Sequence, residues 1–335
     1  RGGRTVPRDA PRYPWAVPDR RPPQRSRRDA AVRRRRRGAL LVLVGLALVG
    51  VLIYAFRPSD GGSAAGADPT ATLSAVDLAA QKAAKSAEAG AKAVDELEQR
   101  AWSIGEYASQ VPSSDGVNAG AERGNMVALT FDDGPGKDTW DVLALLKRYK
   151  MRATFFVIGQ NIENNPGVIA AAVRDGNVVG DHSWTHASLP SLDQSGLTRE
   201  IMDTKSAIQR EAGQAPTLMR PPFGDFTAKT NEYVRSKGML PVLWTIDTDD
   251  WQLQDPGTIA ANVLNSPALK PGAIILLHDG SMNRQMTVNA LPLILDGLVA
   301  RGLRSVTVPE LLRQGPPTIA RPGDYTLSDY AKQSN

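Results

Sequence analysis

Cysteine is absent from this chain of 335 residues. Without thiols the protein can form neither disulfides nor thiolate metal sites, and no cysteine can serve as a nucleophile. Any bound metal must therefore be held through oxygen and nitrogen. Histidine is nearly as rare, since the chain contains only His182, His186 and His278. Each of these three positions is consequently informative.

Clustered basic charge is absent from most of the chain. The net charge is +5, but residues 1–37 hold 14 arginines against three aspartates, a net charge of +11, so the other 298 residues sum to −6. Binding of nucleic acid needs clustered Lys and Arg to neutralise phosphates. We therefore expect no nucleic-acid partner. Residues 1–37, rich in Arg and Pro and without an apolar period, are predicted to be a disordered tail.

A long apolar run comes directly after this tail. Residues 38–56 (GALLVLVGLALVGVLIYAF) are 19 uncharged residues, about the length of a helix that crosses a bilayer. They predict one transmembrane helix, and the arginines before it place the N-terminus in the cytoplasm. The alternative is a cleaved signal peptide, because Ala65-Gly66-Ala67 has the form that a signal peptidase accepts. Both interpretations place the rest of the chain outside the cytoplasm, either anchored in the cell membrane or secreted.

Residues 57–124 are expected to form a linker and a stalk. Residues 57–70 are rich in Gly, Ser and Pro, residues 71–102 are rich in Ala and predict a helix, and residues 103–124 resemble a second linker. The Ala-rich helix could instead pack on the domain C-terminal to it. Residues 315–335 are polar and predict a flexible C-terminal tail.

Residues 125–314 show short apolar runs that alternate with longer amphipathic ones, which is typical of βα units. Seven candidate strands lie at residues 127–131, 153–158, 178–180, 217–219, 240–246, 273–277 and 305–308. The pattern predicts an α/β fold, with a distorted barrel of about seven βα units favoured over an open sheet. Periodicity alone does not separate these two architectures.

Polar residues come directly after five of these strands. They are Asp132-Asp133, the His182/His186 pair, Arg220, residues 247–251 and His278. In parallel βα folds, sites assemble at the carboxyl ends of the strands. We therefore expect these side chains to meet at one rim.

The two histidines of His-Ser-Trp-Thr-His are four residues apart, so on a helical turn both imidazoles would reach a single ion. Neutral imidazole suits zinc and related divalent metals. With Asp133 the site would offer two nitrogens and one oxygen, and the open position would indicate a catalytic metal. Asp132 would remain free to move a proton. The Asp pair alone could equally be a helix cap or a turn.

His278 ends a very apolar run and could act as a general acid near neutral pH or as a fourth metal ligand. Arg220 and Asp250 could orient a carboxylate and a histidine, or could be plain surface ion pairs.

Five sequence blocks occur in order: TFDDGP, HSWTH, RPPFG, DTDDW and LLH. With them the chain resembles the NodB-homology polysaccharide deacetylases, carbohydrate esterase family four, over about residues 125–312. The resemblance implies a distorted (β/α) barrel with fewer than eight full units.

The resemblance also implies roles for the site residues. It implies Asp132 as the catalytic base and Asp133, His182 and His186 as ligands of a divalent metal, usually zinc, with cobalt or another divalent ion as alternatives. His278 would protonate the leaving amine. The supporting and substrate-binding residues implied are Arg220 beside Asp132, Asp250 beside His278, the Phe223 backbone N–H at the oxyanion, and Trp251 and Leu276 around the acetyl methyl. The family often has Tyr where Phe223 stands.

The function expected is metal-dependent hydrolysis of N-acetyl groups from an extracytoplasmic N-acetylhexosamine polymer. Peptidoglycan is the first choice, with N-acetylglucosamine ahead of N-acetylmuramic acid, and chito-oligosaccharide or another exopolysaccharide is the alternative. A non-catalytic wall-binding module could keep the fold, but no implied ligand or base is missing. A phosphatase or glycosidase could use the Asp pair but leaves His182 and His186 unexplained.

Overall fold

The computed structural model describes residue 85 and residues 103–252 and 255–324. Several predicted segments lie outside these ranges: the N-terminal tail at residues 1–37, the transmembrane helix at residues 38–56, and all of the Ala-rich segment except Lys85. Within the described ranges, no helix combines the length and the apolar character needed to cross a membrane.

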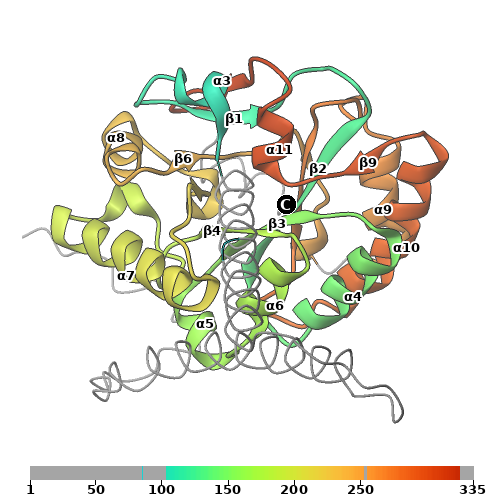
Figure 1. Ribbon diagram of the computed structural model, residues 1–335, viewed down its shortest axis with the longest axis horizontal. Helices are drawn as coiled ribbons and strands as arrows, with labels where there is room; N and C mark the ends of the chain where they lie inside the picture. The colour runs from blue at the N-terminus through green and yellow to red at the C-terminus, as the bar shows by residue number, and fades with distance from the viewer. Residues whose placement is uncertain (1–84, 86–102, 253–254, 325–335) are drawn as a thin grey trace, which may run out of the picture. The chain divides into compact units, whose positions relative to one another are not determined.

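The main sheet has eight strands in the order β6-β5-β4-β3-β2-β8-β7, with β9 also paired to β2 (Figure 1). All of its strand pairs are parallel. The strands are β2 (Met126–Gly134), β3 (Ala153–Val157), β4 (Val178–Asp181), β5 (Leu218–Met219), β6 (Leu240–Pro241), β7 (Ile246–Asp247), β8 (Ile274–His278) and β9 (Arg304–Ser305). The prediction of an α/β fold is confirmed. The predicted barrel is a half-barrel in the structure, because β6 and β7 end the strand order and do not pair with each other.

Helices connect most of the strands (Figure 1). Those between β2 and β9 are α4 (Thr139–Tyr149), α5 (Gly159–Asn164), α6 (Val168–Arg174), the 3₁₀ turn η1 (Leu189–Ser191), α7 (Gln194–Ala212), η2 (Pro222–Gly224), α8 (Ala228–Ser236), η3 (Asp250–Gln252), α9 (Pro256–Leu264) and α10 (Gln285–Ala300). After β9 comes α11 (Val308–Leu312). Because these crossovers keep the strands parallel, the carboxyl ends of the strands share one rim.

The strand expected over 240–246 is two strands, β6 and β7, which form the two edges of the sheet. Of the residues between them, Val242 donates its N–H to the carbonyl of Met219 in β5, and Thr245 donates its N–H to the carbonyl of Ile274 in β8. The carbonyls of Val242 and Leu243 accept hydrogen bonds from the Arg220 guanidinium, and the Leu243 N–H donates to the carbonyl of Val117. The largely apolar run does not locate this interruption, because the groups that bond to Val242 and Leu243 lie in other parts of the chain.

The segments expected as a second linker and a flexible tail contain ordered structure. Residues 103–124 contain α3 (Gly105–Ser109) and β1 (Gly116–Ala119), and β1 pairs antiparallel with β10 (Thr318–Ala320). Val117 of β1 is fully buried and forms a bridge with Val242. For the described residues these two predictions were wrong, because composition rich in Gly, Ser and Pro describes local flexibility, whereas β1 is held by partners more than a hundred residues away.

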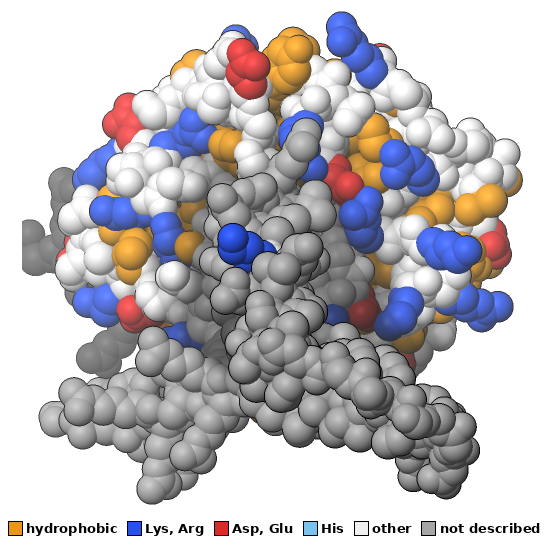
Figure 2. Space-filling model, viewed as in Figure 1, with side chains coloured by type: hydrophobic (Ala, Val, Ile, Leu, Met, Phe, Trp, Pro, Cys, Tyr) orange, Lys and Arg blue, Asp and Glu red, His pale blue; other side chains and the backbone are white. Residues whose placement is uncertain are grey.

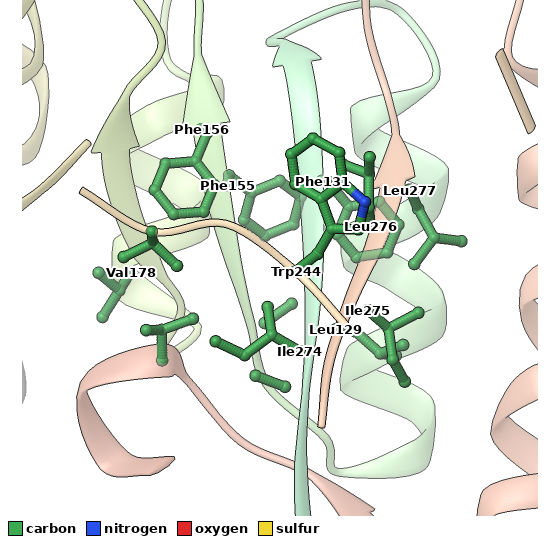
Figure 3. Packing of buried hydrophobic residues seen from close by; sticks show 14 of the residues in the cluster. Leu129, Phe131, Phe155, Phe156, Val178, Trp244, Ile274, Ile275, Leu276 and Leu277 are labelled. Carbon is green, nitrogen blue, oxygen red and sulfur yellow. The ribbon is translucent and has the colours of Figure 1, made fainter. Parts of the chain in front are cut away.

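The core lies between the sheet and its covering helices. All nine residues of β2 and all five of β8 are buried, as expected for parallel strands covered on both faces. Figure 3 shows Phe131, Phe155 and Leu276 among the packed side chains, and the rings of Phe131 and Phe155 stack with centroids 5.2 Å apart. At the carboxyl ends of β2 and β8 this apolar packing gives way to carboxylates and an imidazole.

Candidate metal centre and active site

Asp133, His182 and His186 lie together at the carboxyl rim of the sheet. Each can offer one ligand atom, and these atoms all lie within 4.8 Å of one another. Asp133 Oδ1 is 3.6 Å from His182 Nε2 and 3.4 Å from His186 Nε2. The face drawn in Figure 2 shows no histidine among its coloured atoms. His182 and His278 are almost completely buried.

The donor atoms of this group are those a metal requires. Among the described residues, Asp133 Oδ1 is buried without a hydrogen-bond partner. Leaving a buried carboxylate oxygen unsatisfied is costly, and a cation in this position would relieve that cost. His182 Nδ1 lies 2.7 Å from the carbonyl oxygen of Arg220, so this nitrogen carries the proton and Nε2 presents its lone pair.

The protonation states of His186 and Asp133 also suit metal binding. Burial lowers the pKa of His186 to about 4, so its imidazole is neutral near pH 7. Burial alone would raise the pKa of Asp133, but the neighbouring His186, His278, His182 and Arg284 outweigh it and lower the pKa, so the carboxyl is ionised. Neutral imidazole and ionised carboxylate are the forms that bind divalent metals.

The two carboxylates face the same side because β2 is irregular at its end. Adjacent side chains of a regular strand point to opposite faces. Asp133 has a positive φ of 71°, and the pairing of β2 with β3 shifts register between Asp132 and Gly134. This kink brings Asp132 Oδ2 to 3.7 Å from His182 Nε2, close to the oxygen of Asp133 that faces the same ring.

The histidine pair does not lie on a helical turn, so that prediction was wrong. Residues 182–186 form a loop after β4, in which Ser183 and His186 adopt positive φ angles of 65° and 63°. The carbonyls of Ser183 and Trp184 accept hydrogen bonds from the backbone at the start of α5. The imidazoles converge because the loop is shaped this way, and not because of helical periodicity.

Arg220 comes directly after β5 and is fully buried, so it is not a surface residue. Its Nη1 donates to Asp132 Oδ1 at 2.8 Å and also to Thr130 Oγ1. The guanidinium carbon lies 4.3 Å from the centroid of the Phe156 ring. One oxygen of Asp132 is thereby fixed while the other faces His182.

His278 and Asp250 form a buried pair. His278 Nδ1 is 2.7 Å from Asp250 Oδ1, and the other oxygen of Asp250 accepts from the His278 backbone N–H and the Thr287 hydroxyl. Burial alone would lower the pKa of His278, but the charge and hydrogen bond of Asp250 outweigh it and raise the pKa to about 9. The imidazole is thus a proton donor at neutral pH. In the register of β2 and β8, His278 is the direct neighbour of Asp132.

This pair yields a testable titration. In the metal-free protein we expect ¹⁵N NMR to give His278 a pKa near 9, and Asp250→Asn to lower it. Because the folded pKa is raised above the ordinary 6.5, the pair stabilises the fold below pH 6.5, and that contribution disappears as the pH rises through about 9. With three histidines in the chain, assignment is simple. An unchanged pKa in Asp250→Asn would contradict the role given to Asp250.

The three expected substrate contacts lie in different settings. Phe223 in η2 has a φ of 62°, and its ring meets that of His186 edge-on at 4.5 Å. Trp251 in η3 is half-buried beside Asp250. Leu276 lies two residues before His278 on β8 and has no exposed surface. Its side chain therefore offers no surface to a substrate in this structure.

Sequence reasoning missed Arg284 and Asp279, in the segment between β8 and α10. Arg284 is buried, with Nη2 at 3.5 Å from Asp133 Oδ2 and Nε bonded to the carbonyl of Gly280. Burial raises the pKa of Asp279 to about 7, and its carboxyl accepts from Thr139. The available signal was their position directly after His278 at the same rim.

Comparison with known proteins agrees with this geometry. A family model described as polysaccharide deacetylase matches residues 119–242. A peptidoglycan-N-acetylglucosamine deacetylase of Bacillus cereus is 34% identical over 189 residues, covering 56% of this chain and 68% of that protein. The chain belongs to the polysaccharide deacetylase family. It is therefore a hydrolase of the deacetylase type, and the resemblance to carbohydrate esterase family four is confirmed.

Two further relatives show how far the likeness of this polysaccharide deacetylase extends. The peptidoglycan-N-acetylmuramic acid deacetylase PdaC of Bacillus subtilis is 37% identical over 188 residues, covering 56% of this chain but 38% of that protein. The crystal structure of a peptidoglycan N-acetylglucosamine deacetylase superposes with a TM-score of 0.56 at 33% identity, covering 60% of this chain and 94% of the other. The shared part is the catalytic fold.

Proposed function

We propose that this polysaccharide deacetylase removes acetyl groups from N-acetylglucosamine of peptidoglycan with a divalent metal, most simply zinc. The observation that carries the proposal is the arrangement at the rim: an Arg-held carboxylate, Asp132, and an Asp-held imidazolium, His278, on neighbouring strands beside the group Asp133, His182 and His186. The relatives named for peptidoglycan deacetylation support this substrate, with N-acetylmuramic acid as the second sugar.

Asp133, His182 and His186 would hold the metal, which when bound supplies Lewis acidity toward the acetamide carbonyl. Asp132 accepts the proton of the attacking water, while Arg220 keeps its carboxylate in place. The backbone N–H of Phe223 would donate to the oxygen that becomes negative.

The His278 side chain completes the reaction by donating its proton to the amine nitrogen as the C–N bond breaks. Asp250 keeps the imidazole charged for this step. The products are acetic acid, which releases its proton to solvent and becomes acetate, and a free amine on the sugar. Asp132 takes one proton from water and His278 gives one to the amine, so a single proton transfer from one side chain to the other, through solvent, restores both.

The proposal is tested by incubating the full chain with purified cell wall, digesting with a muramidase and measuring free amines on each sugar by mass spectrometry. We expect new amines on glucosamine, loss of activity after treatment with a chelator, and recovery on adding zinc. New amines on muramic acid alone would make N-acetylmuramic acid the substrate in place of N-acetylglucosamine. Activity on chito-oligosaccharide alone would favour that alternative substrate. Absence of acetate release from any glycan would support a non-catalytic wall-binding module.

We also propose that residues 38–56 anchor the enzyme as a single-pass membrane protein with the N-terminus in the cytoplasm and the catalytic domain outside. Support comes from the apolar run and the arginines before it. Cell fractionation after alkaline extraction should retain the protein in the membrane. Recovery of a shortened chain in the medium would instead indicate cleavage and secretion.

A further inference from the structure

Glu200 of α7 holds the loop that joins the two histidines. Its Oε2 accepts hydrogen bonds from the backbone N–H groups of Trp184 and Thr185, each at 2.8 Å, and its Oε1 accepts from the Thr185 hydroxyl at 2.8 Å. Trp184 and Thr185 lie between His182 and His186. A single carboxylate therefore makes three contacts to the segment that sets the distance between the two imidazoles.

The loop has a conformation that its own sequence does not favour. Ser183 and His186 both lie in the left-handed region, which is costly for residues with a side chain and persists where the surroundings impose it. The carbonyls of Ser183 and Trp184 are bonded to the N–H groups of Gly159 and Gln160. Glu200 accepts hydrogen bonds from the N–H groups of the same two peptide bonds, those of Trp184 and Thr185. Hydrogen bonds to a carboxylate are strong, so the loop is fixed from both sides.

The helix that carries Glu200 is a rigid support. Leu197 and Ile201, its neighbours on α7, are buried, and Ile201 has no exposed surface. The Thr204 hydroxyl donates to the Glu200 carbonyl one turn later. The packing of α7 thus fixes the backbone at Glu200, whose side chain makes the three hydrogen bonds to the loop.

We propose that Glu200 is the positioning residue of the metal-binding loop, and that its three hydrogen bonds place His186 opposite Asp133 before the metal arrives. This rests on the proposed metal function of Asp133, His182 and His186. The rival explanations are a purely structural role in the fold and a purely electrostatic attraction between a carboxylate and the cation.

Substitutions at one position separate these explanations. Glu200→Ala removes all three contacts. Glu200→Gln removes the negative charge but keeps an oxygen for the two N–H groups and a polar group for Thr185. Asp203→Ala, on the exposed face of the same helix, removes an equal charge and is the matched control.

The readout is the zinc dissociation constant, measured on folded protein by competition with a chromophoric chelator. We expect Glu200→Ala to raise it about 10–100-fold, the range known for losing a group that hydrogen-bonds a metal ligand and orients it, because Glu200 orients His186 through the loop. Glu200→Gln should stay near the wild type, and Asp203→Ala should equal it. An unchanged constant in Glu200→Ala, or equal losses in the Ala and Gln variants, would overturn the proposal.

A second measurement does not depend on metal. In the crystal structure of metal-free Glu200→Ala, Ser183 and His186 should leave the left-handed region and the 3.4 Å approach of His186 Nε2 to Asp133 Oδ1 should be lost. An unchanged loop would refute the positioning role. If wild-type protein binds no zinc while the loop moves in the variant, the proposed metal function fails, and only the part of the inference that Glu200 holds the loop stands.

Discussion

Replacing Asp132 by asparagine should reduce deacetylation by roughly 10²–10⁴-fold, the range for loss of a positioned acid–base group. Asparagine preserves the size of the side chain and the contact with Arg220, but it cannot accept a proton. Bound metal should remain near one per chain, because Asp133 and the two histidines are untouched. Acetate release and metal content by mass spectrometry, measured on one preparation, check both expectations.

Asp133→Asn is the matched control for this prediction. It makes the same chemical change one residue later, at the carboxylate whose unpartnered Oδ1 faces both imidazoles. We expect this variant to lose metal and, with it, activity. If Asp132→Asn lost the metal and Asp133→Asn kept it, the roles of the two aspartates would be exchanged.

The largest loss of stability should come from Arg220→Met. The guanidinium is fully buried and donates to Asp132, Thr130 and the carbonyls of Val242 and Leu243. Methionine fills much of the space but leaves a buried carboxylate without its partner, which costs about 3–5 kcal/mol. Urea unfolding of the metal-free protein measures this change in the free energy of unfolding.

Two variants calibrate the result. Arg199→Met, at an exposed position on α7, should change stability by no more than about 0.5 kcal/mol. The double variant Arg220→Met with Asp132→Asn should be more stable than the sum of the single effects, because no uncompensated charge remains buried. Strict additivity would mean that the ion pair does not couple the two residues.

The strands and the rim could be predicted because they depend on local patterns. Apolar runs such as 127–131 and 273–277 mark buried parallel strands, and the polar residues directly after them must lie at the carboxyl end. Two features were enough to predict that Asp132, Asp133 and His278 lie at that end: the alternation of apolar and amphipathic runs, and the direction of the chain. The five blocks at this rim also sufficed to recognise the family.

The contacts that shape the site could not be predicted in the same way. Arg220 bonds to residues 242 and 243, Glu200 to residues 184 and 185, and Arg284 approaches Asp133 from 151 positions away. Each contact joins elements whose mutual position depends on the packing of the whole sheet. The same holds for β1 and β10, whose composition indicated loose segments.

By itself, the sequence determined which chemical groups this protein has and at which edge of the sheet they stand, since absence of cysteine, three histidines and the strand pattern are all local properties. Only the tertiary structure decided how these groups face one another. A positive φ at Asp133 turns two adjacent carboxylates to one side, and a loop outside helical geometry brings His182 and His186 together. Such conformations are unfavourable locally and exist because distant side chains, Arg220 and Glu200 among them, hold the surrounding backbone in place.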